Sequence, residues 1–400
     1  MPPAPHPLPS GVLFPMPTMT ARSRTEIHRT STPLELLFDL CFVVAVAQAG
    51  RRLLHAVSEG HAATGVVSYA AVFFAIWWAW VNFSWFASAY DTDDVLYRVV
   101  TFVQIAGVLV FASGVPRAFD SGDWTIGVTG YVVMRLAMTS QWLRAAHSTR
   151  GAERRVALRY AVGITLTQLG WIGMLFLTEN KGGARAAVFV VLVLAELSVP
   201  AIAERDRATD WHAHHIGERY GLFTIIVLGE TIAAATVAVQ EAMAEHNAFG
   251  DLLPLTAGGL LIVFSAWWIY FAVPIHDYLH GSREAFLWGY GHYLIFGSAA
   301  AIGAGIEVAA EEAVGKAHVS DIVAAGAVTV PSAIFFLTVW ALHARHFKRD
   351  LAEQLSLPAA ALAILACTFA GAWAVFAAGL VAAATVATGE LLSRRAAPAQ

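Results

Sequence analysis

The chain has 400 residues, of which 58% are hydrophobic and 14% are charged, and its formal net charge is −4. Soluble domains carry about a quarter charged residues, so this composition excludes an ordinary soluble domain. Long apolar runs recur from about residue 33 to residue 393, which predicts an all-α polytopic membrane protein in contact with the lipid bilayer. The negative charge and the lack of a basic patch argue against a nucleic-acid partner.

Residues 1–30 are rich in Pro, Ser and Thr and contain no continuous apolar core. A cleavable signal peptide needs a basic region followed directly by an apolar run, so we expect a disordered cytosolic tail instead. Cys41 and Cys367 both lie in apolar stretches and belong to no metal-spaced cluster. We therefore predict no metal site and no cofactor.

A membrane-spanning helix needs about 20 predominantly apolar residues. By this rule the sequence predicts twelve spans, at 33–54, 64–90, 95–114, 122–146, 155–177, 185–203, 216–239, 252–276, 285–309, 318–343, 357–377 and 379–394. The break between the last two spans is expected to be very short, and Gly371 and Gly379 are the residues that hint at it.

Lys and Arg are enriched in the cytoplasmic loops of membrane proteins. If the N-terminus is cytoplasmic, the inner segments hold about three times as many of these residues as the outer segments. The sequence therefore predicts a multi-pass protein with both termini in the cytoplasm.

Two segments of the chain, Glu35–Gln48 and Glu218–Thr231, resemble each other. Each begins with a carboxylate on an otherwise apolar helix, and each is followed by a second apolar stretch that ends in paired tryptophans. Twelve spans then divide into two six-helix repeats, residues 31–210 and 211–396. An even number of spans in each unit makes the repeats parallel, and a substrate or ion path is expected between them.

Several charged side chains fall inside the predicted spans, where a charge is costly and is kept mainly for function. Glu35 and Asp39 lie one turn apart on one face of the first helix. Glu35 is close enough to the helix start to act as a cap, whereas Asp39 lies a turn deeper. Glu230 and Glu196 lie well inside their spans, and Arg135 is the obvious countercharge for one buried acid. Which acid it meets cannot be read from the sequence.

The second copy of the repeated segment opens with Glu218 and Arg219, which follow His212, His214 and His215. Two or three histidines can bind zinc or respond to pH. Because no further ligand has a fixed spacing, we interpret this stretch as a polar cytoplasmic loop that is solvated or ion-paired.

Aromatic groups that include Trp78 and Trp268 lie near the cytoplasmic ends of their helices. Such rings are typical of the aromatic belts at membrane interfaces. Because Asn82 shares the stretch with Trp78, a lining of the translocation path is the alternative interpretation.

The motifs Glu35-Leu-Leu-Phe-Asp39 and Glu218-Arg-Tyr-Gly-Leu-Phe-Thr-Ile-Ile-Val-Leu-Gly-Glu230 resemble those of the bacterial low temperature requirement protein A family. The resemblance extends from about residue 30 to residue 393. It implies a multi-pass protein of the bacterial inner (plasma) membrane. It gives no substrate, because the biochemical activity of the family is poorly defined.

The first helix also resembles, more weakly, that of the endolysosomal and bacterial potassium channels with an R-x-x-x-F-S-D signature, through the spacing of Glu35 and Asp39. In this chain Pro33 stands where that pattern has Arg, and Phe38 stands where it has Ser. Both departures weaken the transfer of ion-channel activity.

The sequence contains no Walker A, H-E-x-x-H, G-x-S-x-G or dinucleotide motif. The leading hypothesis is therefore a channel-like protein or secondary transporter for a cation or small solute. An intramembrane enzyme acting on a lipid or isoprenoid-like substrate is the alternative. A stress-related membrane protein without transport is a third option. The oligomeric state, a homo-oligomer included, cannot be read from the sequence.

Overall fold

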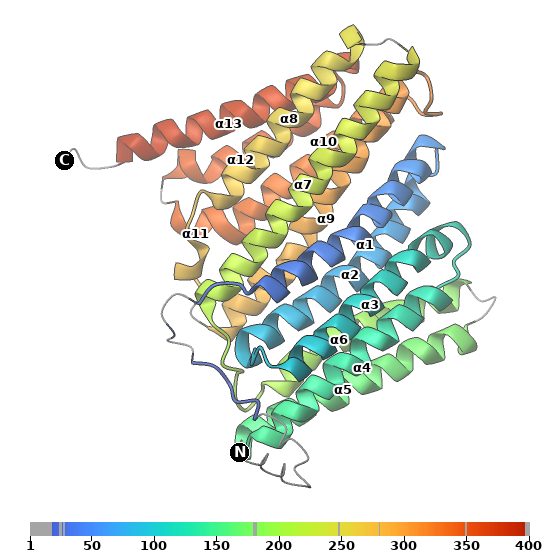
Figure 1. Cartoon of the computed structure of the whole chain (residues 1–400). Coiled ribbons are helices and arrows are strands. Elements are labelled where there is room, and N and C mark those ends of the chain that lie inside the picture. Colours follow the sequence, from blue (N-terminus) through green and yellow to red (C-terminus); the bar gives the residue numbers. More distant parts are fainter. Residues whose placement is uncertain are drawn as a thin grey trace, which may run out of the picture.

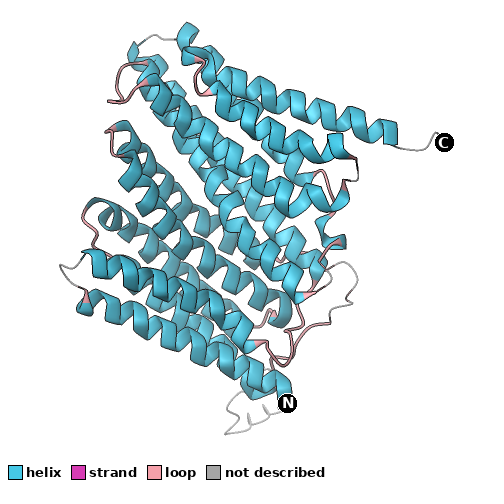
Figure 2. Cartoon of the chain, turned by 180° about the vertical axis from the view of Figure 1, so that it is seen from behind, coloured by secondary structure: helices cyan, strands magenta, loops and turns pink. Residues whose placement is uncertain are grey.

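The computed structural model describes residues 18–23, 26, 29–178, 182–246, 249–279, 281–348 and 350–396, and in these ranges it is helical without β-strands (Figure 2). The first half comprises α1 (Pro33–Ser58), α2 (Ala62–Tyr90), α3 (Val95–Asp120), α4 (Thr125–Ser148), α5 (Gly151–Leu177) and α6 (Gly182–Ala203). The second half comprises α7 (Ala213–His246), α8 (Phe249–Phe271), α9 (Ser282–Ala313), α10 (Asp321–Val339), α11 (Arg345–Phe347), α12 (Leu351–Cys367) and α13 (Ala374–Ala396). Two 3-10 turns, η1 (Ile275–Asp277) and η3 (Gly371–Trp373), and a π-helical segment, η2 (Trp340–Ala344), complete the described elements.

The twelve long helices correspond to the twelve predicted spans, which confirms the all-α polytopic architecture. Within the described ranges, ten helices are long and apolar enough to cross a membrane by length and composition. The other two are α4, which carries Arg135 among several polar residues, and α12, which has only 17 residues.

The break between the last two helices lies at Gly371, and the expectation that Gly379 also marks it is wrong. Gly371 has a φ of +59°, a left-handed conformation that glycine adopts without steric cost. Gly379 instead lies inside α13 and packs against Gly258 of α8. The predicted span 357–377 is therefore shifted toward the N-terminus, to Leu351–Cys367, and the predicted span 379–394 is extended at both ends, to Ala374–Ala396.

The two halves of the chain form two adjacent groups of helices (Figure 1). In the first half, α1 packs against α2 and α3, and the chain continues through the contacts α3–α4, α4–α5 and α5–α6. In the second half, α7 packs against α8 and α9, and the contacts continue as α9–α10, α10–α12 and α12–α13. The succession of contacts along the chain is similar in both halves, but α13 of the second half also packs extensively against α8, and the parallel repeat itself stays a prediction. The halves meet where α1 and α2 pack against α7 and α9.

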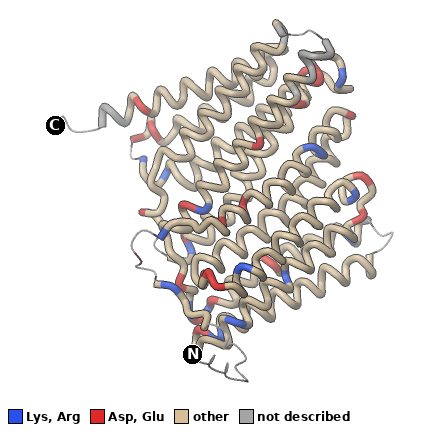
Figure 3. The backbone as a smooth tube through the Cα atoms, in the orientation of Figure 1, with Lys and Arg blue, Asp and Glu red and all other residues tan. Residues whose placement is uncertain are grey.

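The outer surface of the bundle is apolar, as a lipid environment requires. Large apolar side chains such as Val67, Phe176 and Leu177 are 70%, 75% and 76% exposed on the flanks of their helices. Charged residues gather at the ends of the helices, and few lie along their middle (Figure 3). The chain is therefore an integral membrane protein that contacts lipid.

The start of α1 is fixed by local sequence. Thr32 precedes the helix and its Oγ1 accepts a hydrogen bond from the Glu35 backbone N–H at 3.3 Å, while the Thr32 backbone N–H donates to Glu35 Oε2 at 2.8 Å. Pro33 occupies the first helical turn, where its missing N–H has no cost. This capping box sets the position of Glu35, and Asp39 follows one turn later.

Most of the predicted tail, residues 1–30, lies outside the described residues. Of its described part, Met19 and Arg29 are buried against the helix ends. The Met19 backbone N–H donates to Ser148 Oγ of α4 at 2.9 Å, and Arg29 Nη2 donates to the Ala87 carbonyl of α2 at 2.8 Å. These contacts hold the approach to α1 against one end of the bundle.

Candidate functional site between the two halves

A buried ion pair joins the two halves. Asp39 of α1 accepts a hydrogen bond on Oδ1 from Arg219 Nη2 of α7 at 2.6 Å, and both side chains are fully buried. The indole N–H of Trp80 donates to the same oxygen at 2.7 Å, and Ser84 Oγ accepts from Arg219 Nη2 at 3.3 Å. Helices α1, α2 and α7 therefore meet at one charged centre.

A second polar contact between the halves lies one turn away. His215 Nε2 of α7 is 3.2 Å from Glu35 Oε1, and both side chains are fully buried. The expectation of a polar loop is wrong for His215, because α7 begins at Ala213 and places this ring inside the bundle. Glu35 therefore both caps α1 and contacts the second half.

Buried polar atoms remain without a protein partner at this centre. Within the described chain, Asp39 Oδ2, Arg219 Nε and Arg219 Nη1 have no hydrogen-bond partner. Buried polar atoms in native proteins are nearly always paired, and a buried ion pair with unpaired hydrogen-bond donors or acceptors is costly. The centre is therefore able to bind a further polar group.

An aromatic layer closes the interface beside the ion pair. The Trp80 ring stacks on Phe223 with centroids 4.6 Å apart, and Phe223 meets Phe296 of α9 edge to face at 4.9 Å. All three rings are fully buried. This layer separates the ion pair from the remainder of the interface.

Glu230 lies in a separate cavity between α1, α7 and α9, whose lining is mostly apolar with a few polar side chains. The cavity has a volume of about 210 Å³, and its polar lining includes Arg51, Glu230, Thr231 and Glu307. Eleven residues separate Arg219 from Glu230 along α7, which corresponds to about 16 Å of helix. The structure thus places Asp39 and Glu230 on the same interface but does not bring them together.

Arg135 meets Glu196, which answers the question that the sequence left open. Arg135 Nη2 of α4 donates to Glu196 Oε2 of α6 at 2.5 Å. The indole N–H groups of Trp78 and Trp171 donate to the same carboxylate at 2.8 and 3.2 Å. The network is buried, and it lies entirely within the first half, where it links α2, α4, α5 and α6.

The remaining predicted site residues occupy other places. Asn82 donates from Nδ2 to the Trp78 carbonyl at 2.7 Å and lines a small aromatic pocket with it. Trp268 is 46% exposed and donates to Glu390 Oε1 at 3.0 Å. Glu218 is half-buried, its Oε2 has no hydrogen-bond partner in the described chain, and none of the described contacts joins it to Arg219.

The turn between α2 and α3 carries two acids with opposite behaviour. Burial, together with the nearby Glu35 carboxylate, raises the pKa of Asp91 to about 6. Burial also acts on Asp94, but hydrogen bonds from Arg144 and from the Tyr97 N–H outweigh it and lower its pKa to about 2. Asp91 and Asp94 lie directly after α2, the helix that carries Trp80.

The sequence analysis did not predict four side chains of this interface as site residues: Arg51, Trp80, His215 and Glu307. Glu307 lies in an apolar span, so the rule that singled out Glu230 also applies to it. Arg51 and His215 lie near the ends of their spans, where the sequence resembles a loop. In the described chain no three His, Cys, Asp or Glu side chains are grouped as metal ligands.

Residues 30–389 match the model of the family described as bacterial low temperature requirement A protein. A curated relative, an uncharacterized protein of Rhizobium meliloti (strain 1021), is 29% identical over 259 residues. That match covers 62% of this chain and 60% of the relative.

Proposed function

Because the chain belongs to the bacterial low temperature requirement A protein family and is an integral membrane protein, we propose that it translocates a cation or small solute along the interface between its halves. The observation that carries this proposal is that an ion pair, an aromatic layer and a cavity with charged side chains succeed one another on one interface. The Asp39–Arg219 pair, the aromatic layer and the cavity with Glu230 all lie between α1, α2, α7 and α9. Such a succession resembles a closed path, and we call the cavity that contains Glu230 its binding vestibule.

The vestibule has the composition of a site for a positively charged species. Two carboxylates, Glu230 and Glu307, and one guanidinium, Arg51, line it together with the Thr231 side chain. The Thr231 hydroxyl lies within donating distance of two carbonyl oxygens, those of Val227 and Ala299, at 3.1 and 2.9 Å. The formal charge of the lining is negative, which favours a cation over an anion.

In this proposal the Asp39–Arg219 pair acts as the gate, and it couples movement of the halves to binding of an ion. Opening the interface separates Asp39 from Arg219, and an isolated buried carboxylate is very unfavourable. A proton or another cation that binds Asp39 compensates for the loss of Arg219. Movement of the halves then depends on binding of that ion, which is the behaviour of a secondary transporter.

The orientation follows from the distribution of Lys and Arg. With both termini in the cytoplasm, the ion pair lies on the cytoplasmic side of the aromatic layer and the vestibule lies on the outer side. We propose that the described conformation is open outward and closed inward, in the inner membrane of a bacterium.

The test is flux through the purified full chain in liposomes, with panels of monovalent cations and small amines. Glu230→Gln is expected to lower the flux at least tenfold, because it removes a charge from the vestibule. Glu390→Gln is the matched control, since Glu390 is a carboxylate on α13 that binds Trp268 and lines none of the cavities described above. Equal flux in both variants and in the unaltered chain would remove Glu230 from the path.

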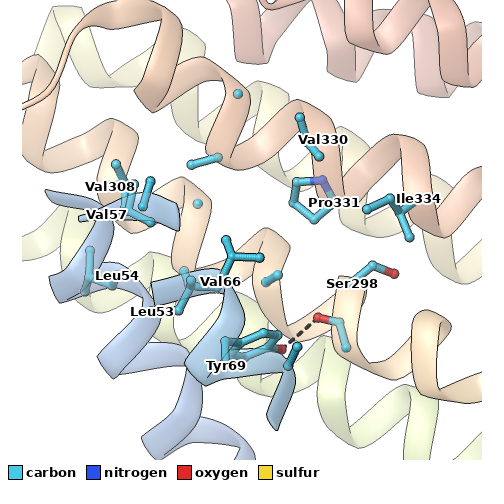
Figure 4. A pocket seen from close by; sticks show the side chains of 18 of the residues that line it. Leu53, Leu54, Val57, Val66, Tyr69, Ser298, Val308, Val330, Pro331 and Ile334 are labelled. Atoms are coloured by element: carbon cyan, nitrogen blue, oxygen red, sulfur yellow. Dashed lines mark hydrogen bonds between the residues drawn. The ribbon is translucent and has the colours of Figure 1, made fainter. Parts of the chain in front are cut away.

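A second candidate, binding of a lipid chain, is favoured by a separate groove. A groove of about 400 Å³ between α1, α2, α9 and α10 is lined almost entirely by apolar side chains such as Val57, Val66 and Val330 (Figure 4). The Tyr69 hydroxyl is already committed to the Gly297 carbonyl at 2.7 Å. No carboxylate is among the described lining residues, so the groove suits an acyl or isoprenoid chain better than acid–base catalysis on one.

A further inference from the structure

A second pocket between the halves lies on the opposite face of α2 from the Asp39–Arg219 pair. Trp78, Asn82 and Trp85 follow one another at i, i+4 and i+7 on that face, whereas Trp80 and Ser84 point to the ion pair. Seven of the eleven lining residues are aromatic, and they come from both halves: Trp78, Trp85, Phe86, Trp142, Tyr160, Phe286 and Tyr290.

Most of the N–H and O–H groups of this pocket donate to acceptors outside it. Trp78 Nε1 donates to Glu196, Trp85 Nε1 donates to the Tyr220 hydroxyl at 3.0 Å, and the Tyr290 hydroxyl donates to the Leu197 carbonyl at 3.1 Å. No described contact gives an acceptor to the indole N–H of Trp142, so the pocket keeps few donors for an anion. What remains are aromatic rings, which attract cations electrostatically.

Asn82 adds an oxygen acceptor to the rings. One N–H of its Nδ2 donates to the Trp78 carbonyl at 2.7 Å, which leaves the Oδ1 acceptor and the second N–H of the amide for other partners. The side chain is half-buried, which keeps it within reach of an entering ion.

A carboxylate lies directly behind the rings. Glu204 Oε1 accepts hydrogen bonds from the Tyr160 hydroxyl and from Thr209 Oγ1, both at 2.8 Å, and both donors belong to residues that line the pocket. Tyr160 also stacks on Trp142 with centroids 4.1 Å apart and nearly parallel planes. A negative charge is thus held one side chain away from the aromatic surface.

From this arrangement we infer that the pocket formed by Trp78, Asn82, Trp85, Trp142, Tyr160 and Tyr290 is a binding site for ammonium. The cavity of about 30 Å³ accommodates a particle the size of one water molecule. Ammonium has that size, donates hydrogen bonds to an amide oxygen and interacts with aromatic faces. A metal cation needs a shell of several oxygen ligands, and the lining provides few.

The inference goes beyond the proposed translocation, because it concerns equilibrium binding at a place outside the Asp39–Glu230 interface. The experiment therefore measures binding rather than flux. The purified full chain in lipid nanodiscs is titrated with ammonium chloride against sodium chloride at constant ionic strength, and its tryptophan fluorescence is recorded. Potassium chloride and tetramethylammonium chloride are titrated in the same way.

The expected result is a saturable fluorescence change with ammonium, a much weaker one with potassium and none with tetramethylammonium, which is too large for the cavity. Asn82→Leu, which keeps the volume but removes the acceptor, is expected to weaken ammonium binding about tenfold or more. Tyr160→Phe, which detaches Glu204 from the ring, is a second variant in case Asn82→Leu does not fold. Phe369→Leu, at a position that is 77% exposed, is the control and is expected to bind as the unaltered chain does.

Three results would overturn the inference. The first is a response to ammonium that does not saturate, and the second is an equal response to potassium or sodium. The third is unchanged ammonium affinity in a folded Asn82→Leu or Tyr160→Phe variant. A failed flux experiment would not produce any of these results, so the two proposals fail independently.

Discussion

Two arginine–carboxylate pairs are buried in the bundle, and they differ in what they join. Arg135 and Glu196 connect helices of the first half, and two indole N–H groups saturate the carboxylate. Asp39 and Arg219 connect the two halves, and among the described residues each keeps a polar atom without a partner, as Arg135 of the first pair also does at Nε. The first pair is built to hold a bundle together, whereas the second is built at a place where separation would be useful.

Removing one member of the pair between the halves is expected to destabilise the protein more than removing both charges. Asp39→Asn leaves Arg219 as an uncompensated buried charge and should cost about 3–5 kcal/mol. The double variant Asp39→Asn with Arg219→Met leaves neither member of the pair charged and should recover most of that loss. Thermal unfolding of the three proteins in detergent measures the difference. A double variant as unstable as the single one would argue against the ion pair.

The pKa of Asp91 predicts how stability changes with pH. Its folded value of about 6 exceeds the unfolded value of about 3.9, so the folded state takes up a proton first as the pH falls. Between about pH 7 and pH 4, protonation of Asp91 therefore adds stability as the pH decreases. Asp91→Asn should raise the apparent unfolding temperature by several degrees at pH 7.5, and this gain should vanish by about pH 4.5.

Asp94→Asn is the control for this pH dependence. The pKa of Asp94 is lowered to about 2, so its stabilising contribution is complete throughout the same pH window. This variant should be less stable than the unaltered chain by a constant amount from pH 7.5 to pH 4.5. Parallel pH profiles for the Asp91→Asn variant and the unaltered chain would contradict the account.

Which residues carry buried charge was predictable, but their partners were not. The cost of a charge inside a membrane singled out Asp39, Arg135, Glu196 and Glu230 from the sequence alone. Arg135 meets a residue 61 positions away and Asp39 meets one 180 positions away. Such contacts depend on how helices rotate and pack, which the apolar periodicity of a single helix does not specify.

At the scale of the helices, a pair of glycines allows α8 and α13 to cross at close range. A Cβ atom added at Gly379 of α13 would lie 2.5 Å from the Gly258 carbonyl oxygen of α8. Because the contact is with backbone, the helices themselves would have to separate. The α8–α13 contact in the second half therefore requires small residues at both positions.

Gly379→Ala is expected to destabilise the protein by about 1–3 kcal/mol, because the added methyl group overpacks this crossing. Gly389→Ala on the same helix is the control, since a Cβ there meets nothing within 4 Å. Alanine is the better helix former by about 1 kcal/mol, so the control should be neutral or more stable. Thermal unfolding measures both, and equal effects would contradict the close approach.

The helices themselves were the most predictable part of the structure. Every predicted span has a helix, because about 20 consecutive apolar residues leave few alternatives in a membrane. The last break was misplaced because Gly371 and Gly379 carry the same sequence signal, although one turns the chain and the other packs against a helix. Only the three-dimensional neighbours distinguish these two uses of glycine.

At the scale of the whole molecule, the proposed function rests on the contact between the two halves. Glu35, Asp39 and Trp80 of the first half meet His215 and Arg219 of the second. The duplicated segments are thus in contact, and their chemistry differs, since Leu222 in the second copy follows Glu218 at the spacing that separates Asp39 from Glu35. The centre is therefore asymmetric, with its acids on α1 and its basic side chains on α7.

The most direct test of this account is cation or solute flux through liposomes that contain one of two matched double variants. Asp39→Asn with Arg219→Met neutralises the pair between the halves, and Glu196→Gln with Arg135→Met neutralises the pair inside the first half. Each double variant loses one buried pair without leaving a charge behind, and folding is verified by size-exclusion chromatography. We predict that the first variant loses ion-coupled flux and that the second retains it. Retained flux in the first variant, or equal loss in both, would contradict a path between the halves.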